Sequence, residues 1–287
     1  MAINYSFDES LVTKQAAAEK AMLEEFHAGN YTLENPLVKL NPYLINPLAA
    51  VVMFKTEEEV AVTVRVLGKE PAATMKHTFP KAKEHVLPIL GLYADYNNTV
   101  EIELYRGAMN TINIQTEPAT DSVAKLVKMD TTAEYLRDEL IIVSPALTDL
   151  ATGFDYAGDV RWHLNIPTVF DIKRAKNGNI LIGTHRLLKI PYYMSGLYEM
   201  TMAGKVIKEY KIPGGYHHDQ FEMEDGNLLV LTEDLTSETV EDMCVLIDRE
   251  TGEILKTWDY KNCLTPGDGA GVSYTDEDWF HNNAVWY

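Results

Sequence analysis

Two adjacent histidines, His217 and His218, are followed by Asp219 in a stretch that carries the chain's clearest candidate chemistry. Imidazole can exchange protons or accept a transferred group near neutral pH. The stretch opens with a glycine pair and contains an Asp225-Gly226 turn between two apolar-spaced runs, a pattern that predicts a β-hairpin. The histidines are therefore expected where the first strand of this hairpin begins.

An internal repeat of about fifty residues, the period typical of propeller blades, gives these histidines a place in the fold. One turn recurs at Gly158, Gly204 and Gly252, which are 46 and 48 residues apart. A second turn recurs at Gly178 and Gly226, 48 residues apart. Each period carries four short strands and no helix, which predicts blades of a β-propeller. Leucine-rich and β-helix solenoids have shorter periods and fit less well.

The repeat places His218 in register with Phe170, because each lies eight residues before a turn glycine of the second kind. The stretch 279–287 is predicted to begin the matching strand of the third period, with His281 lying 63 residues after His218. The first strand of a blade lines the central channel. The sequence therefore predicts that His218 and His281 face the channel mouth from equivalent positions.

Structural roles are expected for the other polar candidates. His217 should point to the face opposite His218, since neighbouring residues of a strand alternate. Asp219 is expected to make a turn or hydrogen bond common to the blades, because Asp171 occupies the matching place. His163 and His185 have no counterpart in the repeat. Polar residues on inner propeller strands can also serve only to hold channel water.

Composition limits the classes of partner. The chain has 287 residues and a formal net charge of -18, which argues against nucleic acid or an anionic membrane surface as the main partner. No run of 18 apolar residues exists, so no membrane insertion is expected. The N-terminus lacks a signal-peptide pattern, which suits a cytoplasmic chain as written or a mature periplasmic one and leaves the compartment open. A disulfide between Cys244 and Cys263 is left open, and the preferred prediction is two unpaired, buried thiols.

The predicted fold class is mainly β, in four parts. Residues 1–34 hold a helix over 10–28, 35–117 form an immunoglobulin-like β-sandwich, 118–150 form a connector, and 151–287 form about two and a half blades of an incomplete propeller. The sandwich strands are expected at 48–54, 60–67, 75–79, 85–90, 99–105 and 111–116, with His77 and His85 facing solvent. The connector is expected to contain a short helix at 131–137 and a strand at 140–143. Trp162 and Trp258 are expected in the core.

Neither a metal nor a cofactor is predicted. The chain has no G-x-G-x-x-G, P-loop or G-x-S-x-G motif. Two histidines on neighbouring blades, without a fixed carboxylate as third ligand, do not make a metal pattern. Because propellers close with about four to eight blades, we expect an N-terminal fragment of a longer protein, or a ring that another chain completes.

Over most of its length the chain resembles the bacterial arylsulfate sulfotransferase family. The shared motifs are Gly91-Leu92-Tyr93, Gly153-Phe154-Asp155 to Trp162, Gly215 to Gly226, and Trp279-Phe280-His281-Asn282-Asn283. The resemblance implies a six-bladed propeller with the site in its channel. It also implies transfer of a sulfuryl group from a phenolic sulfate ester to a phenol acceptor, without a nucleotide donor, through a sulfated histidine.

By the same resemblance, His218 and His281 would bind and polarise the sulfuryl oxygens, and Asn283 would add a hydrogen bond. Imidazolium and amide donors suit the negative charge on those oxygens. The family's sulfate-binding arginine and nucleophilic histidine would fall beyond Tyr287, so this chain alone is expected to be inactive. Its partners would be small molecules, and a homodimer of the full-length protein stays open.

Two other functions remain open from the sequence. A non-enzymatic propeller, acting as a binding or scaffold module, would use its channel histidines only to hold water or a ligand. Another propeller hydrolase or lyase would depend on a metal, which chelator treatment would reveal.

Overall fold

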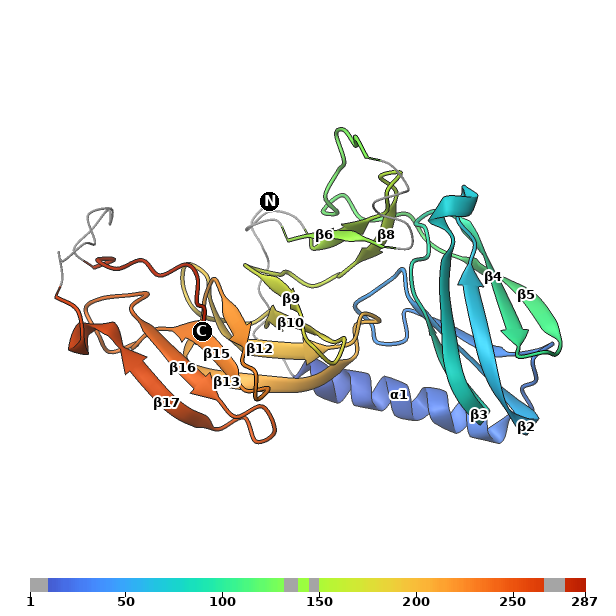
Figure 1. The fold of residues 1–287 in the computed structure, drawn as a ribbon, viewed down its shortest axis with the longest axis horizontal. Coiled ribbons are helices and arrows are strands. Elements are labelled where there is room, and N and C mark those ends of the chain that lie inside the picture. Colours follow the sequence, from blue (N-terminus) through green and yellow to red (C-terminus); the bar gives the residue numbers. More distant parts are fainter. Residues whose placement is uncertain (1–9, 132–138, 145–149, 266–276) are drawn as a thin grey trace. The chain divides into compact units, whose positions relative to one another are not determined.

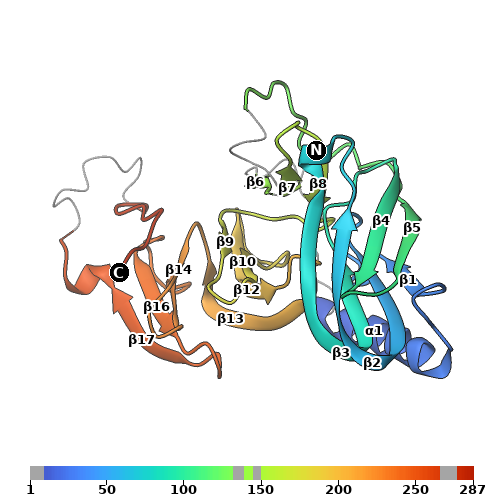
Figure 2. The same ribbon diagram turned by 45° about the vertical axis from the view of Figure 1, so that its right-hand side comes forward.

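The structure is a computed structural model that describes residues 10–131, 139–144, 150–265 and 277–287. The chain divides into two compact units. The described residues of 10–166 and 202–205 form one unit, and those of 167–201 and 206–287 form the other. Figures 1 and 2 show α1 and the long strands β2 and β3 in the first, and β9 to β17 in the second. The described residues are mainly β with one α-helix, as predicted.

Helix α1 (Leu11–Ala28) confirms the predicted helix. Ser10 occupies the N-cap position, and the Gly29 backbone N–H donates to the carbonyl of Glu25 at the C-terminal end. The helix buries Leu11, Met22 and Phe26 on one face. The amide nitrogen of Gln15, also buried, donates to the backbone oxygens of Tyr43 and Gly204 at 2.7 and 2.8 Å. Apolar packing and these two hydrogen bonds fix the helix within the first unit.

The first unit contains a five-stranded antiparallel sheet. Its strands are β1 (Leu37–Leu40), β2 (Ala50–Val66), β3 (Met75–Ile89), β4 (Asn97–Leu104) and β5 (Met109–Gln115). The prediction of separate strands at 48–54 and 60–67, and at 75–79 and 85–90, is wrong, because β2 and β3 each run through both. The polar residues 55–59 do not end β2. Its pairing with β3 continues beyond them, with register shifts between Lys55 and Val62.

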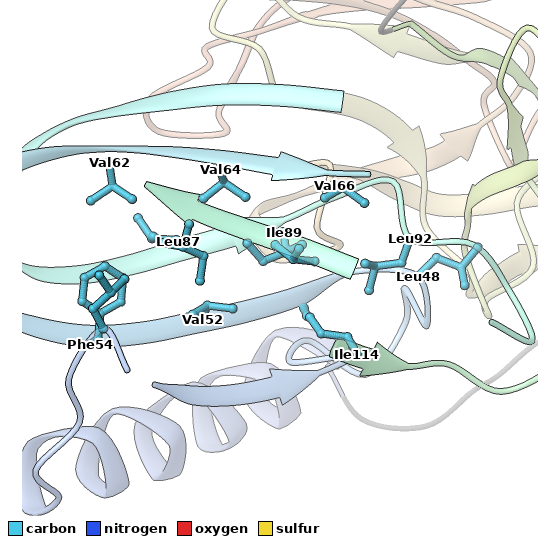
Figure 3. Close-up of a cluster of buried hydrophobic side chains, with 14 residues drawn as sticks. Leu48, Val52, Phe54, Val62, Val64, Val66, Leu87, Ile89, Leu92 and Ile114 are labelled. Carbon is cyan, nitrogen blue, oxygen red and sulfur yellow. The ribbon is translucent and has the colours of Figure 1, made fainter. Parts of the chain in front are cut away.

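The sheet buries one face in a hydrophobic cluster. Val62, Val64 and Val66 alternate along β2 into this cluster and meet Leu87 and Ile89 of β3 (Figure 3). Alternate burial is the consequence of a strand's two-residue period. This core makes the sheet a stable scaffold for the first unit.

Two histidines of this sheet differ in their surroundings. His77 is exposed, as predicted. The prediction for His85 is wrong, since it is only 2% exposed, stacks on Phe54 with ring centroids 4.6 Å apart, and has Nε2 3.1 Å from the Thr56 hydroxyl. A neighbouring aromatic ring and a hydroxyl partner make burial of this imidazole favourable.

A three-stranded sheet completes the first unit. It comprises β6 (Ile141–Val143), which matches the predicted strand at 140–143, β7 (Thr152–Phe154) and β8 (Val160–His163). Most of the predicted helix at 131–137 lies outside the described residues. Trp162 is buried as predicted, and its neighbour Arg161 is fully buried. The Arg161 guanidinium donates to the Tyr93 hydroxyl and pairs with the Asp155 carboxylate, both at 2.9 Å. Tyr93 lies in the connection between β3 and β4, so the first of these bonds joins β8 to the five-stranded sheet.

The second unit contains two antiparallel sheets. The first comprises β9 (Ile172–Arg174), β10 (Ile180–Gly183), β11 (Leu187–Lys189), β12 (Tyr193–Met200) and β13 (Val206–Tyr216). The second is a four-stranded meander of β14 (Gln220–Glu222), β15 (Leu228–Thr232), β16 (Met243–Ile247) and β17 (Ile254–Asp259). The order β9-β10-β12-β13 in the first repeats β14-β15-β16-β17 in the second, as the repeat predicts, and β11 additionally pairs with the start of β12. Closure into a propeller stays a prediction.

Backbone conformation supports the predicted register of the repeat. The turn glycines Gly178 and Gly226 have φ of 86° and 91°. Phe170, His218 and His281, which the repeat places in equivalent positions, have φ of 68°, 50° and 51°. A left-handed backbone is uncommon for residues with side chains, so its recurrence at these three positions is a specific shared feature.

The stretch 279–287 departs from the prediction, because the structure forms no strand there. Its backbone is held by other partners. The Asn282 N–H donates to the Glu241 carbonyl at 3.2 Å, and the Val285 N–H donates to the Asp219 carboxylate at 2.8 Å. The backbone N–H groups of this stretch therefore bond to the carbonyl of a loop residue and to a carboxylate side chain, and not to a neighbouring strand.

The remaining core predictions are met in part. Trp258 is half-buried beside a small cluster that includes Leu229 and Leu231. Cys244 and Cys263 are both free, as predicted, but only Cys244 is buried and Cys263 is exposed.

Candidate functional site

His218 and His281 lie side by side, with ring centroids 6.1 Å apart. His218 belongs to the connection between β13 and β14, and both residues are half-buried. The His218 carbonyl accepts the Asp171 N–H at 3.3 Å and the Tyr216 hydroxyl at 3.1 Å, which holds its left-handed backbone. A strained conformation that several hydrogen bonds enforce is typical of functional sites. The structure thus brings together the two histidines that the sequence singled out.

Asp219 joins the segments that carry these histidines. Its Oδ1 accepts the Gln220 N–H at 2.8 Å and pairs with the Lys173 ammonium. Its Oδ2 accepts the Val285 N–H at 2.8 Å, four residues after His281. The turn role that the repeat predicts is therefore only part of what Asp219 does, since it also fixes the later segment beside β14.

Two carboxylates face His281. Its Nδ1 lies 2.6 Å from Asp278 Oδ2 and 3.3 Å from Glu241 Oε2. The other oxygen of Glu241 accepts the hydroxyls of Tyr192 and Tyr193 at 2.6 and 3.2 Å. Burial raises the pKa of Glu241, and the tyrosine hydroxyls and His281 oppose that rise. Both carboxylates lie on the Nδ1 side of the His281 ring, so Nε2 is the nitrogen left to face a ligand.

Sequence reasoning missed these partners of His281. The Asp278-x-x-His281 spacing is visible in the chain and could have pointed to Asp278. Glu241 lies in the connection between β15 and β16 with φ of 55°, and nothing in the repeat marks it. Long-range loop geometry alone brings it to the site.

His217 contacts His218, so the prediction that it points to the opposite face is wrong. It is fully buried, and its Nδ1 lies 3.1 Å from Nδ1 of His218. Alternation fails because β14 begins only at Gln220 and His218 has a left-handed backbone. Burial lowers the pKa of His217 to about 3, with the Thr232 carbonyl opposing. Burial also lowers the pKa of His218 to about 4, aided by His281 and opposed by Asp219.

Aromatic rings surround His218. Phe170, its counterpart in the repeat, packs on it with centroids 4.2 Å apart, and Tyr192 meets it edge-on at 5.7 Å. Tyr193 makes a similar edge contact with His217 at 5.8 Å. These rings desolvate the histidines, and their faces could also pack against an aryl group.

Among the described residues, no hydrogen bond, ion pair or ring contact brings Asn283, the third predicted site residue, into this cluster. Its side chain is exposed, and among the residues described it makes no hydrogen bond. Its neighbour Asn282 is 9% exposed and donates to the Met243 carbonyl at 3.4 Å. His163 and His185 lie elsewhere; His185 contacts the Tyr198 hydroxyl at 3.1 Å.

The same cluster contains two groups of side chains that could hold a metal ion. His217, His218 and Glu241 form one group, and Glu241, Asp278 and His281 form the other, with ligand atoms within 4.8 Å of one another in each. The sequence predicted no metal pattern because it did not reveal the shared carboxylate, Glu241. Two imidazoles and a carboxylate suit Zn²⁺ or a related ion.

Comparison with protein families matches both parts of the chain. Residues 37–122 match the arylsulfotransferase Ig-like domain, and residues 125–287 match the arylsulfotransferase (ASST) family. A search of curated proteins found no match. Among the described residues, no helix is long and apolar enough to cross a membrane. The chain belongs to the arylsulfotransferase (ASST) family, with its N-terminal Ig-like domain and part of the catalytic domain.

Proposed function

We propose that His218 and His281 bind the sulfuryl group of a phenolic sulfate ester, as part of a sulfuryl transfer to a phenol acceptor. The observation that carries this proposal is the pairing of the two imidazoles, 6.1 Å apart, on backbones with φ of 50° and 51°. Family membership supports aryl sulfates as the substrates. Neither histidine is proposed as the nucleophile.

The chemistry requires donors directed at the sulfuryl oxygens. In a reaction through a sulfohistidine, a histidine nitrogen attacks sulfur, the bond from sulfur to the aryl oxygen breaks, and the phenolate leaves. The acceptor phenol then attacks sulfur, gives up its proton, and the nitrogen–sulfur bond breaks. Negative charge on the sulfuryl oxygens persists through both steps, so imidazolium donors lower the barrier.

His281 has one ring nitrogen that can face a ligand. Asp278 and Glu241 lie 2.6 and 3.3 Å from its Nδ1, which leaves Nε2 as the donor toward a ligand. Asn283 would contribute its amide N–H₂ to the same group, and its exposure leaves that amide available.

The aryl part of the ester would pack on the rings around His218. Phe170 lies 4.2 Å from the His218 ring and Tyr192 lies 5.7 Å from it, between centroids. Offset or edge contacts between aromatic rings contribute about 1 kcal/mol beyond apolar burial. A preference for aryl over alkyl sulfates follows from this arrangement.

The test is direct binding of 4-nitrophenyl sulfate to the purified 287-residue chain, measured by calorimetry. His218→Ala and His281→Ala should each weaken binding about tenfold or more, the loss of a charged hydrogen bond. His77→Ala removes an exposed histidine of the first unit and serves as the matched control. Unchanged affinity in both site variants would overturn the proposal.

A metal-dependent hydrolase is the second candidate, and the His217, His218 and Glu241 group favours it. A bound divalent ion would polarise the ester or a water molecule. The two functions differ in their response to chelators. Binding of 4-nitrophenyl sulfate that EDTA abolishes and Zn²⁺ restores would support the metal-dependent function.

A further inference from the structure

A cavity of about 280 Å³ lies between the two sheets of the second unit. Its walls come from β13 of one sheet and from β15, β16 and β17 of the other, all of which Figure 1 labels. Most of the lining is apolar and includes Ile212, Met243, Val245 and Ile254. A cavity of about 150 Å³ with aliphatic walls can hold benzene. A single aromatic ring therefore fits in this cavity.

Two oxygens at this cavity have no hydrogen-bond partner among the described residues. They are Oγ1 of Thr232 and Oε2 of Glu233, consecutive residues that both line the cavity and are each 2% exposed. Gly214 of β13 has no side chain to cover the Thr232 hydroxyl, and a Cβ there would lie only 2.5 Å from Oγ1. Because buried polar groups are normally hydrogen-bonded, two such oxygens beside one cavity point to a ligand that supplies the partners.

The charge of Glu233 is already balanced. Nζ of Lys189 lies 3.1 Å from its Oε1. Asp234, the other acidic residue of the lining, accepts the backbone N–H and the hydroxyl of Thr236 at 2.9 and 2.7 Å. A second cation beside Lys189 would add a charge that no carboxylate there is left to balance. The cavity therefore favours a neutral ligand.

A hydroxyl group suits the two unpartnered oxygens together. The carboxylate oxygen of Glu233 accepts a hydrogen bond, and the Thr232 hydroxyl can donate one. The O–H of a phenol would donate to Glu233 Oε2, and its oxygen would accept from Thr232. An ammonium group has no acceptor to offer Thr232, and a carbonyl group has no donor to offer Glu233.

We propose that this cavity binds a neutral single-ring phenol, with its ring among the aliphatic side chains and its hydroxyl between Thr232 and Glu233. The inference goes beyond the proposed sulfuryl site and does not depend on it. Thr232 links the two places, because its carbonyl lies 3.2 Å from Nε2 of His217. A phenol in the cavity would thus be held next to the histidine cluster.

The test compares three small aromatic probes on the purified 287-residue chain. 4-Methylphenol is neutral at pH 7, toluene has the same ring without the hydroxyl, and benzylamine is a cation. Met243 lines the cavity, so its methyl signal in ¹H–¹³C spectra reports binding, and Met243→Leu identifies that signal. Met22, buried in the first unit, is the internal control.

We expect 4-methylphenol to shift the Met243 signal with a dissociation constant of about 1 mM and to leave Met22 unchanged. Toluene and benzylamine should bind at least about fivefold more weakly, because neither satisfies both oxygens. A Met243 signal that 4-methylphenol leaves unshifted at about 10 mM would overturn the proposal, with water as the only occupant. Equal affinity for 4-methylphenol and toluene would also overturn it.

Substitutions test the two hydrogen bonds and the cavity separately. Thr232→Val and Glu233→Gln should each weaken 4-methylphenol about fivefold and leave toluene unchanged. Thr257→Val is the matched control, since Thr257 also lines the cavity but is exposed to solvent. Ile254→Trp fills the cavity from a position that is 41% exposed and should abolish the Met243 shift. Equal effects of Thr232→Val and Thr257→Val would contradict the assigned hydrogen bond.

The cavity and the sulfuryl site give separate readouts. Ile254→Trp should leave the calorimetric affinity for 4-nitrophenyl sulfate unchanged, and His281→Ala should leave the Met243 shift by 4-methylphenol unchanged. Loss of that shift in His281→Ala would overturn a separate phenol site. The expected Met243 shift together with no binding of 4-nitrophenyl sulfate would refute the proposed function and leave the phenol site standing.

Discussion

The carboxylate of Asp219 accepts a hydrogen bond from the backbone N–H of Val285 at 2.8 Å, across 66 residues of chain. Asp219 follows His218 directly, and Val285 follows His281 by four residues. This single contact therefore links the two segments that carry the paired histidines. The geometry of the proposed sulfuryl site depends on it.

Replacing Asp219 should disturb the site without removing either histidine. In Asp219→Ala the Val285 N–H loses its acceptor, so the amides of 283–285 should exchange with solvent at least tenfold faster. The dissociation constant for 4-nitrophenyl sulfate should rise by a factor of roughly three to ten, which corresponds to the net contribution of one hydrogen bond. Hydrogen exchange by mass spectrometry and calorimetry measure the two effects. Glu224→Gln, at an exposed neighbouring position, is the control, and equal exchange rates in both variants would contradict the linking role.

Acid should destabilise the second unit through the buried histidines. Burial lowers the pKa of His217 to about 3 from its usual 6.5, so the unfolded chain binds a proton more readily than the folded one between these values. Stability is therefore full above pH 6.5 and falls as pH drops toward 3, by up to about 1.4 kcal/mol per pH unit for this group. Urea unfolding at pH 7, 6 and 5 measures the slope. His217→Gln should flatten it, and an identical slope in the variant would contradict the assignment.

Glu199 should be a strong stabilising residue of the second unit. It is 5% exposed and accepts hydrogen bonds from Arg249, Asn177, Asn179 and Tyr210. Burial acts to raise its pKa, but these donors together lower it to about 2. Glu199→Gln removes one of the two carboxylates that pair with the half-buried Arg249, leaving Glu222, and should cost roughly 2 kcal/mol of unfolding free energy.

The pH dependence gives a second check on Glu199. Its contribution is present above the unfolded pKa of about 4.5 and is lost as pH falls toward the folded value of about 2. Urea unfolding of wild type and variant at pH 7 and pH 3 should therefore differ less at pH 3. Glu253→Gln, at an exposed position, should be neutral. A neutral Glu199→Gln would contradict the prediction.

Metal removal should leave ligand binding intact if the histidines act as donors. Both ring nitrogens of His217 already have partners, the Thr232 carbonyl at 3.2 Å and Nδ1 of His218 at 3.1 Å. Dialysis against EDTA should change the affinity for 4-nitrophenyl sulfate by less than about twofold, measured by calorimetry. A large loss that Zn²⁺ reverses would instead favour the metal-dependent hydrolase.

The repeat was accessible from the sequence because turn glycines leave a spacing that can be counted. That spacing placed His218 in register with Phe170 and His281, and all three have a left-handed backbone in the structure. His217 and Glu241 were not accessible in the same way. Their positions depend on loop backbones with positive φ, which break the simple alternation of side chains and which no local spacing encodes.

The strands of the first unit show a second limit of sequence patterns. Polar residues between two apolar runs predicted a break, yet β2 continues from Ala50 to Val66 because its partner β3 continues as well. Pairing, rather than local composition, decides where these strands end. His85 illustrates the same dependence, since its burial requires Phe54 on the paired strand.

A double-mutant cycle between His218 and His281 tests the central claim most directly. If both imidazoles bind one sulfuryl group, His218→Ala, His281→Ala and the double variant should show a coupling free energy of about 1 kcal/mol or more in 4-nitrophenyl sulfate binding, by calorimetry at pH 6. The same cycle performed without ligand, on unfolding free energy, separates binding from stability. Strictly additive losses, or binding that neither substitution changes, would contradict a shared sulfuryl site.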